Sequence, residues 1–354
     1  MQRIGIALGF LVVTACGPPA PKPADDPASP HVSLLAVGDT GRRHRPVASW
    51  FEGQLSVARA MAWENERRPV DAVVFLGDNF YPRGLQREEL VQRIGENLAL
   101  PYCAFVALDG SRSHELASFC AASESEGTVP LIAVPGNHDL ESPESLDLQC
   151  HAVPEFVSNW NMLCDFVATF ELEGGLSVIA YDSATPGWEE QVDLLGRAIR
   201  DARGPWRILV SHQPVGVDRM DRPVEATVVP AAIAAAGVPV HAHLAGHNHN
   251  LQAFADDAQL PPLRVVAGSG SRARPPITAP HPGRDYGEAR LGFARVDVVG
   301  EGAEARLVLS LYAAAPYPLF SFDTPELVAR FSVDPEGRVR EEFNAQRSED
   351  DAGR

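Results

Sequence analysis

Short apolar runs recur along the chain, and most of them end at a Gly or a Pro and then a polar residue. Runs of this length and composition predict buried β-strands. Five of them cover residues 32–37, 72–76, 131–134, 208–210 and 242–245. The residues that follow these runs are of metal-binding types: Asp39, Asp78, Asn137 with His138, His212, and His247 with His249. One such residue after a strand is ordinary, but five in succession indicate a site.

Helical patterns lie between several of these runs, at Val47–Arg68, Gln86–Leu98, Gly187–Ala202 and Val224–Ala236. Strands that alternate with helices favour an α/β fold with a largely buried sheet. Residues 291–299 and 305–312 predict further strands, which we expect to close a second sheet against the first. The expected architecture is therefore a β-sandwich flanked by helices. In such folds sites lie beyond the carboxyl ends of the strands.

The first 31 residues read as a targeting region. Arg3 precedes an apolar stretch, Ile4 to Val13, which is too short to span a bilayer. The small residues before Cys16 resemble a bacterial lipobox, which predicts a lipoprotein signal peptide over residues 1–16; an ordinary signal peptide cleaved nearby is the alternative. Residues 17–31 form a Pro-rich tether. We expect the folded domain at 32–340 and a charged tail at 341–354.

Export and membrane anchoring through a lipid on Cys16 are the localisation that these features predict, on the periplasmic side or at the cell surface. The chain has 30 Lys and Arg against 47 Asp and Glu, a formal net charge of -17. We therefore expect no nucleic-acid binding, because counterion release needs a basic surface.

The cysteines agree with an exported protein. Setting Cys16 aside leaves an even four, which an oxidising compartment would pair. Four cysteines allow three connectivities, and unpaired buried thiols are the alternative. We expect the short-range pairing of Cys103 with Cys120 and of Cys150 with Cys164.

Each polar motif has a plain structural alternative when it is taken singly. Asp39 is in the position of a turn or helix cap, Gly136-Asn137 is common in turns, and His212 is of a type often found in cores. His247 and His249 are more specific, because residues i and i+2 of an extended segment project to the same side and make a two-point metal grip. Together, in this order, the motifs favour a metal site.

The order of the motifs resembles that of the calcineurin-like metallophosphoesterase superfamily. Within it, the sequence is similar to the purple acid phosphatases of the small, tartrate-resistant type. The usual histidine of the first motif is missing after Asp39, and Tyr81, in Gly-Asp-Asn-Phe-Tyr, stands where that branch places its iron-binding tyrosine. Thr40 departs from the tryptophan usual there, and the stretch between Tyr81 and Asn137 is longer than in the small enzymes.

The resemblance implies a centre of two metal ions, Fe(III) and a divalent iron, zinc or manganese. It places one metal on Asp39, Asp78, Tyr81 and His249, and the other on Asp78, Asn137, His212 and His247, with Asp78 as the bridge. His138 would stand beside the substrate as general acid. The implied activity is hydrolysis of phosphate monoesters; a phosphodiesterase or nucleotidase, or a surface lipoprotein that only binds, are the alternatives.

Other polar residues carry less weight. Arg272 and Arg274 follow a Gly-Ser-Gly turn and are candidates for contact with anionic groups of a substrate, although solvated arginines are commoner. His44, His151 and His281 lie in loop-like sequence and are candidate pocket residues. His241 and His243 lie in a predicted strand and are expected to be structural.

Overall fold

The computed structural model describes residues 26, 29–42, 53–121, 129–185, 191–216, 225–255, 260–276, 284–315 and 324–347. The predicted signal peptide with Cys16 and most of the tether lie outside the described residues. So do His44, His281 and the beginnings of the expected helices at 47–68 and 187–202.

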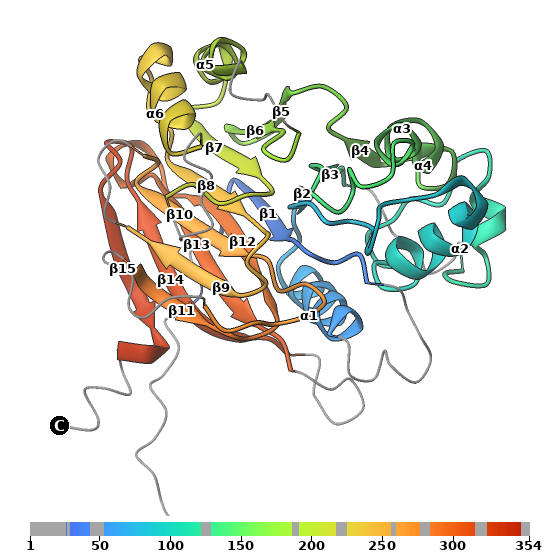
Figure 1. Cartoon of the computed structure of the whole chain (residues 1–354). Coiled ribbons are helices and arrows are strands. Elements are labelled where there is room, and N and C mark those ends of the chain that lie inside the picture. Colours follow the sequence, from blue (N-terminus) through green and yellow to red (C-terminus); the bar gives the residue numbers. More distant parts are fainter. Residues whose placement is uncertain are drawn as a thin grey trace, which may run out of the picture.

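Two β-sheets form the centre of the molecule (Figure 1). The first sheet has the order β15 (Val339–Asn344), β14 (Glu326–Val333), β13 (Arg306–Ala313), β12 (Gly292–Val299), β1 (Val32–Val37), β2 (Ala72–Phe75), β3 (Leu131–Ala133) and β4 (Trp160–Met162). The second sheet has the order β11 (Arg284–Glu288), β9 (Leu251–Phe254), β10 (Leu263–Ala267), β8 (Ala242–Ala245), β7 (Trp206–Ser211), β6 (Leu176–Tyr181) and β5 (Val167–Leu172).

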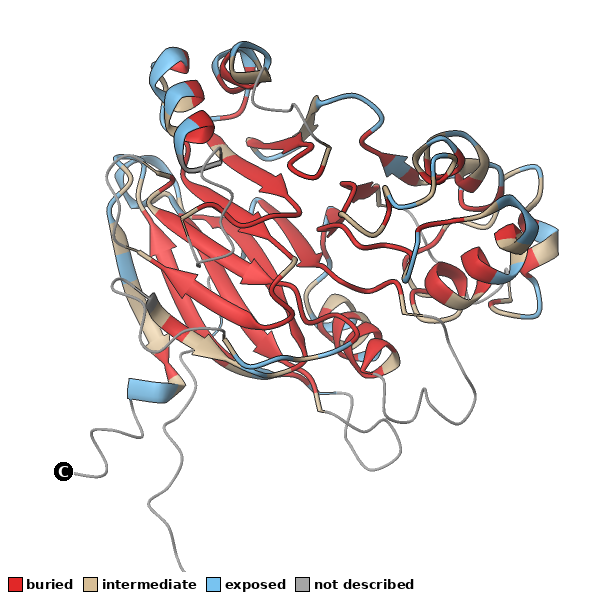
Figure 2. Cartoon of the chain, viewed as in Figure 1, coloured by how far each residue is buried: buried red, intermediate tan, exposed pale blue. Residues whose placement is uncertain are grey.

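The main core lies between the two sheets. Alternate residues of β1 divide between two apolar clusters: Val32, Leu34 and Ala36 point to the core shared with the second sheet, while Leu35 and Val37 point to the opposite side. This is the period of two that a strand imposes on its side chains. Because both faces are covered, the strand is apolar nearly throughout, and the central strands are buried (Figure 2).

Helices cover the outer faces of the sandwich. The α-helices are α1 (Gln54–Arg67), α2 (Leu90–Ile94), α3 (Ser145–Asp147), α4 (Val153–Phe156), α5 (Val192–Asp201) and α6 (Glu225–Ala236). Single turns of 3₁₀ helix form η1 (Arg87–Glu89), η3 (Ser113–Leu116) and η6 (Gly302–Glu304), and π turns form η2 (Gly95–Ala99) and η4 (Leu148–Ala152). Helices α5 and α6 pack together over the second sheet, whereas α1 to α4 lie with the first (Figure 1).

Two elements differ from the boundaries expected from the sequence. The expected helix at Gln86–Leu98 is broken into η1, α2 and η2. Strand β15 runs to Asn344, past residue 340, where a charged tail was expected to begin. No helix among the described residues is long and apolar enough to cross a membrane.

Both expected disulfides are present. Cys103 is bonded to Cys120, and Cys150 is bonded to Cys164. The first pair closes the long connection between β2 and β3, and the second joins η4 to the segment after β4. The short-range pairing is therefore confirmed. Residues 122–128, which belong to the polar segment between Cys120 and β3, lie outside the described residues.

The strands that precede the predicted ligands are parallel within each sheet. β1 pairs with β2 and β2 with β3, while β7 pairs with β8, all in the parallel sense. Parallel neighbours bring their carboxyl ends to the same edge of a sheet. The loops after these strands consequently meet at one edge of the sandwich.

Candidate metal centre

Four of the predicted ligands hold a backbone conformation that is rare for residues other than glycine. The φ angles of Asp39, Asp78, His247 and His249 are 59°, 54°, 68° and 54°. They are the described non-glycine residues with positive φ. Such conformations are strained and cluster at functional sites, where surrounding contacts enforce them. Here the peptide N–H of Asp39 donates to Gly77 O at 2.9 Å, and that of His247 donates to Asp39 Oδ2 at 2.8 Å.

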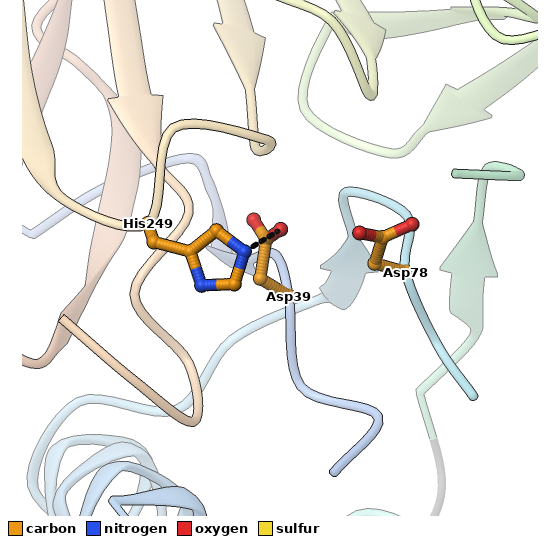
Figure 3. Close-up of side chains that lie close together, drawn as sticks. All are labelled: Asp39, Asp78 and His249. Carbon is orange, nitrogen blue, oxygen red and sulfur yellow. Dashed lines mark ion pairs between the residues drawn. The ribbon is translucent and has the colours of Figure 1, made fainter. Parts of the chain in front are cut away.

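The predicted ligand atoms form two groups, which we call the two halves of the site. The first group lies around the Tyr81 hydroxyl. This oxygen lies 2.9 Å from Asp39 Oδ1, 2.7 Å from Asp78 Oδ2 and 3.1 Å from His249 Nε2. His249 Nε2 is also 3.3 Å from Asp39 Oδ1, and Figure 3 shows the imidazole pointing at that carboxylate. One hydroxyl proton cannot satisfy two carboxylates, so this half has more acceptors than protons.

The second half gathers around the Asn137 side-chain oxygen. His212 Nε2 and His247 Nδ1 each lie 3.1 Å from Asn137 Oδ1, and 3.2 Å from one another. The other ring nitrogen of His212, Nδ1, lies 2.8 Å from Leu76 O, a carbonyl that only accepts. A neutral His212 therefore keeps its proton on Nδ1 and turns the lone pair of Nε2 toward Asn137.

The arrangement fits bound cations. Ligand atoms about 2.1 Å from a shared cation at bond angles of about 90–110° lie about 3.0–3.4 Å apart. The spacings in both halves scatter around this range. Carboxylate, phenol, amide and imidazole are also metal-binding groups. Asp39, Asp78 and His249 form a group whose possible ligand atoms all lie within 4.8 Å of one another.

The acidic side chains of the site crowd one another. Burial and the neighbouring charge of Asp78 raise the pKa of Asp39 well above its ordinary value. Burial raises the pKa of Tyr81, and the two carboxylates raise it further. Burial lowers the pKa of His249 to about 4, with Arg274 adding to the effect, so the imidazole stays neutral with a lone pair to offer. A cation would compensate this negative charge.

His138 lies beside the donor groups and is not part of either. Its Nδ1 is 2.7 Å from Pro82 O and 3.0 Å from Glu141 Oε1. Both neighbours are acceptors, which fixes a proton on Nδ1 and leaves Nε2 to face elsewhere. The ring packs against Tyr81 with centroids 4.6 Å apart, and a third of the side chain is exposed.

Asp139 has a role that sequence reasoning missed, although it directly follows Asn137 and His138. The side chain is fully buried and accepts hydrogen bonds from the peptide N–H groups of Asn79, Phe80 and Gly136 at 2.9–3.0 Å. It therefore joins the loop that carries Asp78 to the loop that carries Asn137. Burial, and then Asp78, raise the pKa of Asp139 to about 7.

Glycine is required where two of the ligand loops touch. A Cβ atom on Gly246 would lie 2.7 Å from Leu76 O and 2.8 Å from Asp39 Oδ2. The loops after β1, β2 and β8 can approach only because this position has no side chain. A further missed contact is Ser271, whose hydroxyl donates to Asp39 O at 2.5 Å.

A cavity of about 390 Å³ opens over these groups. Its walls include Asp78, Asn137, His138, His247, Asn248, His249, Arg272, Arg274 and Pro275. Four predicted ligands thus line the cavity with His138, and the other three, Asp39, Tyr81 and His212, contact them from outside its wall. Of the lesser candidates, the two arginines line the cavity, while the exposed His151 lies elsewhere, 3.7 Å from Asp147.

His241 and His243 are buried away from the cavity, as expected of structural residues. His243 Nε2 lies 2.8 Å from the Ser211 hydroxyl and 3.2 Å from the Tyr181 hydroxyl. Burial, with Arg264 adding to it, lowers the pKa of His243 to about 3, and burial lowers that of His241 to about 4. Both rings are therefore neutral, His243 within β8 and His241 directly before it.

Comparison with solved structures shows a shared fold. The purple acid phosphatase PPD1 from yellow lupin (Lupinus luteus) seeds aligns with a TM-score of 0.59 at 14% identity, over 86% of this chain and 53% of the lupin chain. The chain thus spans about half the length of the lupin enzyme. PhoD aligns with a TM-score of 0.56 at 12% identity, over 89% of this chain and 72% of that chain.

A third similar structure is described as GAP50, the anchor in the inner membrane complex of Plasmodium. Its TM-score is 0.55 at 14% identity, over 84% of this chain and 89% of that chain. At these identities the likeness is one of fold alone. No curated protein matches the sequence.

The sequence itself is the stronger guide to the family. Residues 32–251, which are well over half of the chain, match the profile of the family described as calcineurin-like phosphoesterase. This range begins at β1 and includes every predicted ligand from Asp39 to His249. The chain belongs to the calcineurin-like phosphoesterase family.

Proposed function

We propose that this protein is a metal-dependent phosphatase that hydrolyses phosphate monoesters at a dinuclear centre, in the manner of the purple acid phosphatases. One observation carries the proposal: the two carboxylate oxygens of Asp78 face different donor groups. Oδ2 lies 2.7 Å from the Tyr81 hydroxyl, and Oδ1 lies 3.5 Å from His212 Nε2. A carboxylate placed between two clusters of donor atoms is suited to bridge two cations.

Each cluster has the composition of one metal site. Asp39, Asp78, Tyr81 and His249 would hold the first ion, and Asp78, Asn137, His212 and His247 the second. A phenol has an ordinary pKa near 10, so its binding as phenolate favours a strongly acidic cation such as Fe(III). The amide oxygen and two imidazoles suit a divalent iron, zinc or manganese ion.

The two ions, when bound, would supply charge neutralisation for the phosphate oxygens and an activated water as nucleophile. Residues of the chain would position the ligands and transfer the proton. Asp139 joins the loop of Asp78 to the loop of Asn137 and so fixes the positions of these two side chains relative to one another. His138 lines the cavity, its Nδ1 is engaged by Pro82 O, and its Nε2 would protonate the leaving alkoxide. Glu141 and Pro82 O would support the imidazolium from the other side.

The test is a comparison of phenyl phosphate with diphenyl phosphate as substrates of the purified, metal-loaded protein. The proposal predicts that the monoester is cleaved with the higher kcat/KM. Faster cleavage of the diester would instead support the phosphodiesterase alternative. Cleavage of neither substrate by protein that holds two metals would support a role in binding alone.

We also propose that the protein is exported and anchored in the membrane by a lipid on Cys16. The lipobox-like sequence before Cys16 and the Pro-rich segment after it support this. The two disulfides add to the support, because disulfides persist in oxidising compartments.

A further inference from the structure

Two arginines stand at the cavity next to the predicted metal ligands. Arg272 and Arg274 follow β10, on a loop that begins at Gly268, and both side chains are exposed. The peptide N–H of Arg274 donates to His249 O at 2.6 Å, which attaches this loop to a predicted ligand. The backbone of this loop is therefore held beside the predicted ligands, while both arginine side chains line the cavity and are exposed.

Among the described residues neither guanidinium forms a hydrogen bond or an ion pair, although Arg274 interacts electrostatically with Asp39 and His249. Other exposed arginines pair with a nearby carboxylate, as Arg338 does with Asp334 and Arg347 with Asp285. A third donor of the same cavity is also unsatisfied: Asn248 is 5% exposed, and its Nδ2 has no acceptor among the described residues.

The negative charge of the protein bears on what these three donors could bind. The chain has a formal net charge of -17, and the predicted ligand Asp78 adds a carboxylate to the wall of the cavity. A substrate with several negative charges would be repelled by this field. Two arginines at the cavity offset the repulsion locally, and a guanidinium binds carboxylate or phosphate with two parallel hydrogen bonds.

We propose that Arg272 and Arg274, with Asn248 beneath them, form an anion subsite for a second negatively charged group of the substrate. This inference rests on the proposed function, in which the first phosphate occupies the metal centre. The substrate class is then phosphate monoesters that carry a further phosphate or carboxylate. Both groups are oxyanions with at least two acceptor oxygens, which can each receive hydrogen bonds from a guanidinium.

The experiment measures the binding of two non-hydrolysable ligands to the metal-loaded protein by calorimetry. Phenylphosphonate carries one anionic group, and 4-phosphonobenzoate carries a carboxylate in addition. We expect the wild-type protein to bind 4-phosphonobenzoate about tenfold more tightly, as is usual for one charge-assisted contact that is open to solvent. The double variant Arg272→Gln/Arg274→Gln should lose this preference and bind phenylphosphonate within about twofold of the wild type.

A double variant that removes the same charge elsewhere is the control. Arg197 on α5 and Arg340 on β15 are exposed and lie outside the cavity, so Arg197→Gln/Arg340→Gln should keep the preference. Equal affinities of the two ligands for the wild type would overturn the subsite. So would an equal loss for both ligands in the Arg272/Arg274 variant, which would place the arginines on the metal-bound group. Binding is measured apart from turnover, so a protein that shows the preference but does not cleave phenyl phosphate contradicts the proposed function alone.

Discussion

The Tyr81 hydroxyl lies 2.7 Å from Asp78 Oδ2, three residues away along the same loop. The loop is bent by the positive φ of Asp78, so that both side chains point to one place. Asp39 and His249 reach the same hydroxyl from two other loops, at 2.9 and 3.1 Å. A tyrosine that only filled space beside Phe80 would not gather three ionisable groups around its oxygen.

Tyr81→Phe tests the metal that this contact implies. The change keeps the ring and removes only the hydroxyl, so the fold should survive. A tyrosinate on Fe(III) gives a visible charge-transfer band, and the oxidised wild-type protein should therefore be purple or pink. The variant should lose the band and change in metal content, as measured by absorption spectra and elemental analysis. A colourless, active wild-type protein that holds only zinc would contradict the assignment of iron.

His138→Ala should separate metal binding from turnover. The His138 imidazole contacts Pro82 O and Glu141, and the backbone N–H that donates to Asp78 Oδ1 at 2.9 Å is kept in the variant, so both metals should stay bound. Turnover should fall by roughly 10²–10⁴-fold, the usual effect of losing a general acid. Metal analysis and kcat with phenyl phosphate measure the two effects, and unchanged kcat would rule out the role given to His138.

His243 should make the folded state sensitive to acid. Its pKa is lowered from 6.5 to about 3 in the folded protein, so between these values the unfolded chain binds a proton that the native chain refuses. Stability should be fully present above about pH 6.5 and fall by at most about 1.4 kcal/mol per pH unit below it. Urea unfolding from pH 7 to pH 4 should show a shallower fall for His243→Gln. An identical pH dependence in both proteins would mean that His243 is not held neutral.

Cys16→Ser tests the anchor. The change should move the protein from the membrane fraction to the soluble fraction and leave phosphatase activity intact, if the lipid on Cys16 is the one attachment. Fractionation followed by an activity assay measures both. A variant that still sediments with membranes would disprove the anchor.

The sequence indicated which residues lie together at the candidate site, and it indicated the fold in part. The predicted ligands Asp39, Asp78 and His212 come within a few residues of strand ends, and parallel strands bring these ends together. The edge strands β11 and β15 were not predicted. β11 pairs with β9, from which β10 separates it in the sequence, whereas β15 forms a hairpin with its sequence neighbour β14. Their polar residues also weaken the alternating pattern that identifies a strand.

Residues that position the predicted ligands leave a weaker signal in the sequence. Asp139 is buried by two loops that meet only in three dimensions, so its adjacency to His138 was the one signal available. The break of the expected helix at Gln86–Leu98 was missed as well. Apolar residues there follow a helical period, yet the segment packs as a 3₁₀ turn, a short α-helix and a π turn.

The most direct test of the dinuclear centre is the metal content of the wild-type protein and of Asp78→Ala, measured together with hydrolysis of phenyl phosphate. Asp71→Ala is the matched control, because Asp71 is an exposed aspartate at the opposite end of β2 that accepts one backbone hydrogen bond. We predict two metal ions per active wild-type chain and per Asp71→Ala chain. Asp78→Ala should lose both metals and activity together, because the bridge is gone. Full activity with one metal per chain, or an Asp78→Ala variant that keeps both ions and turns over normally, would contradict the account.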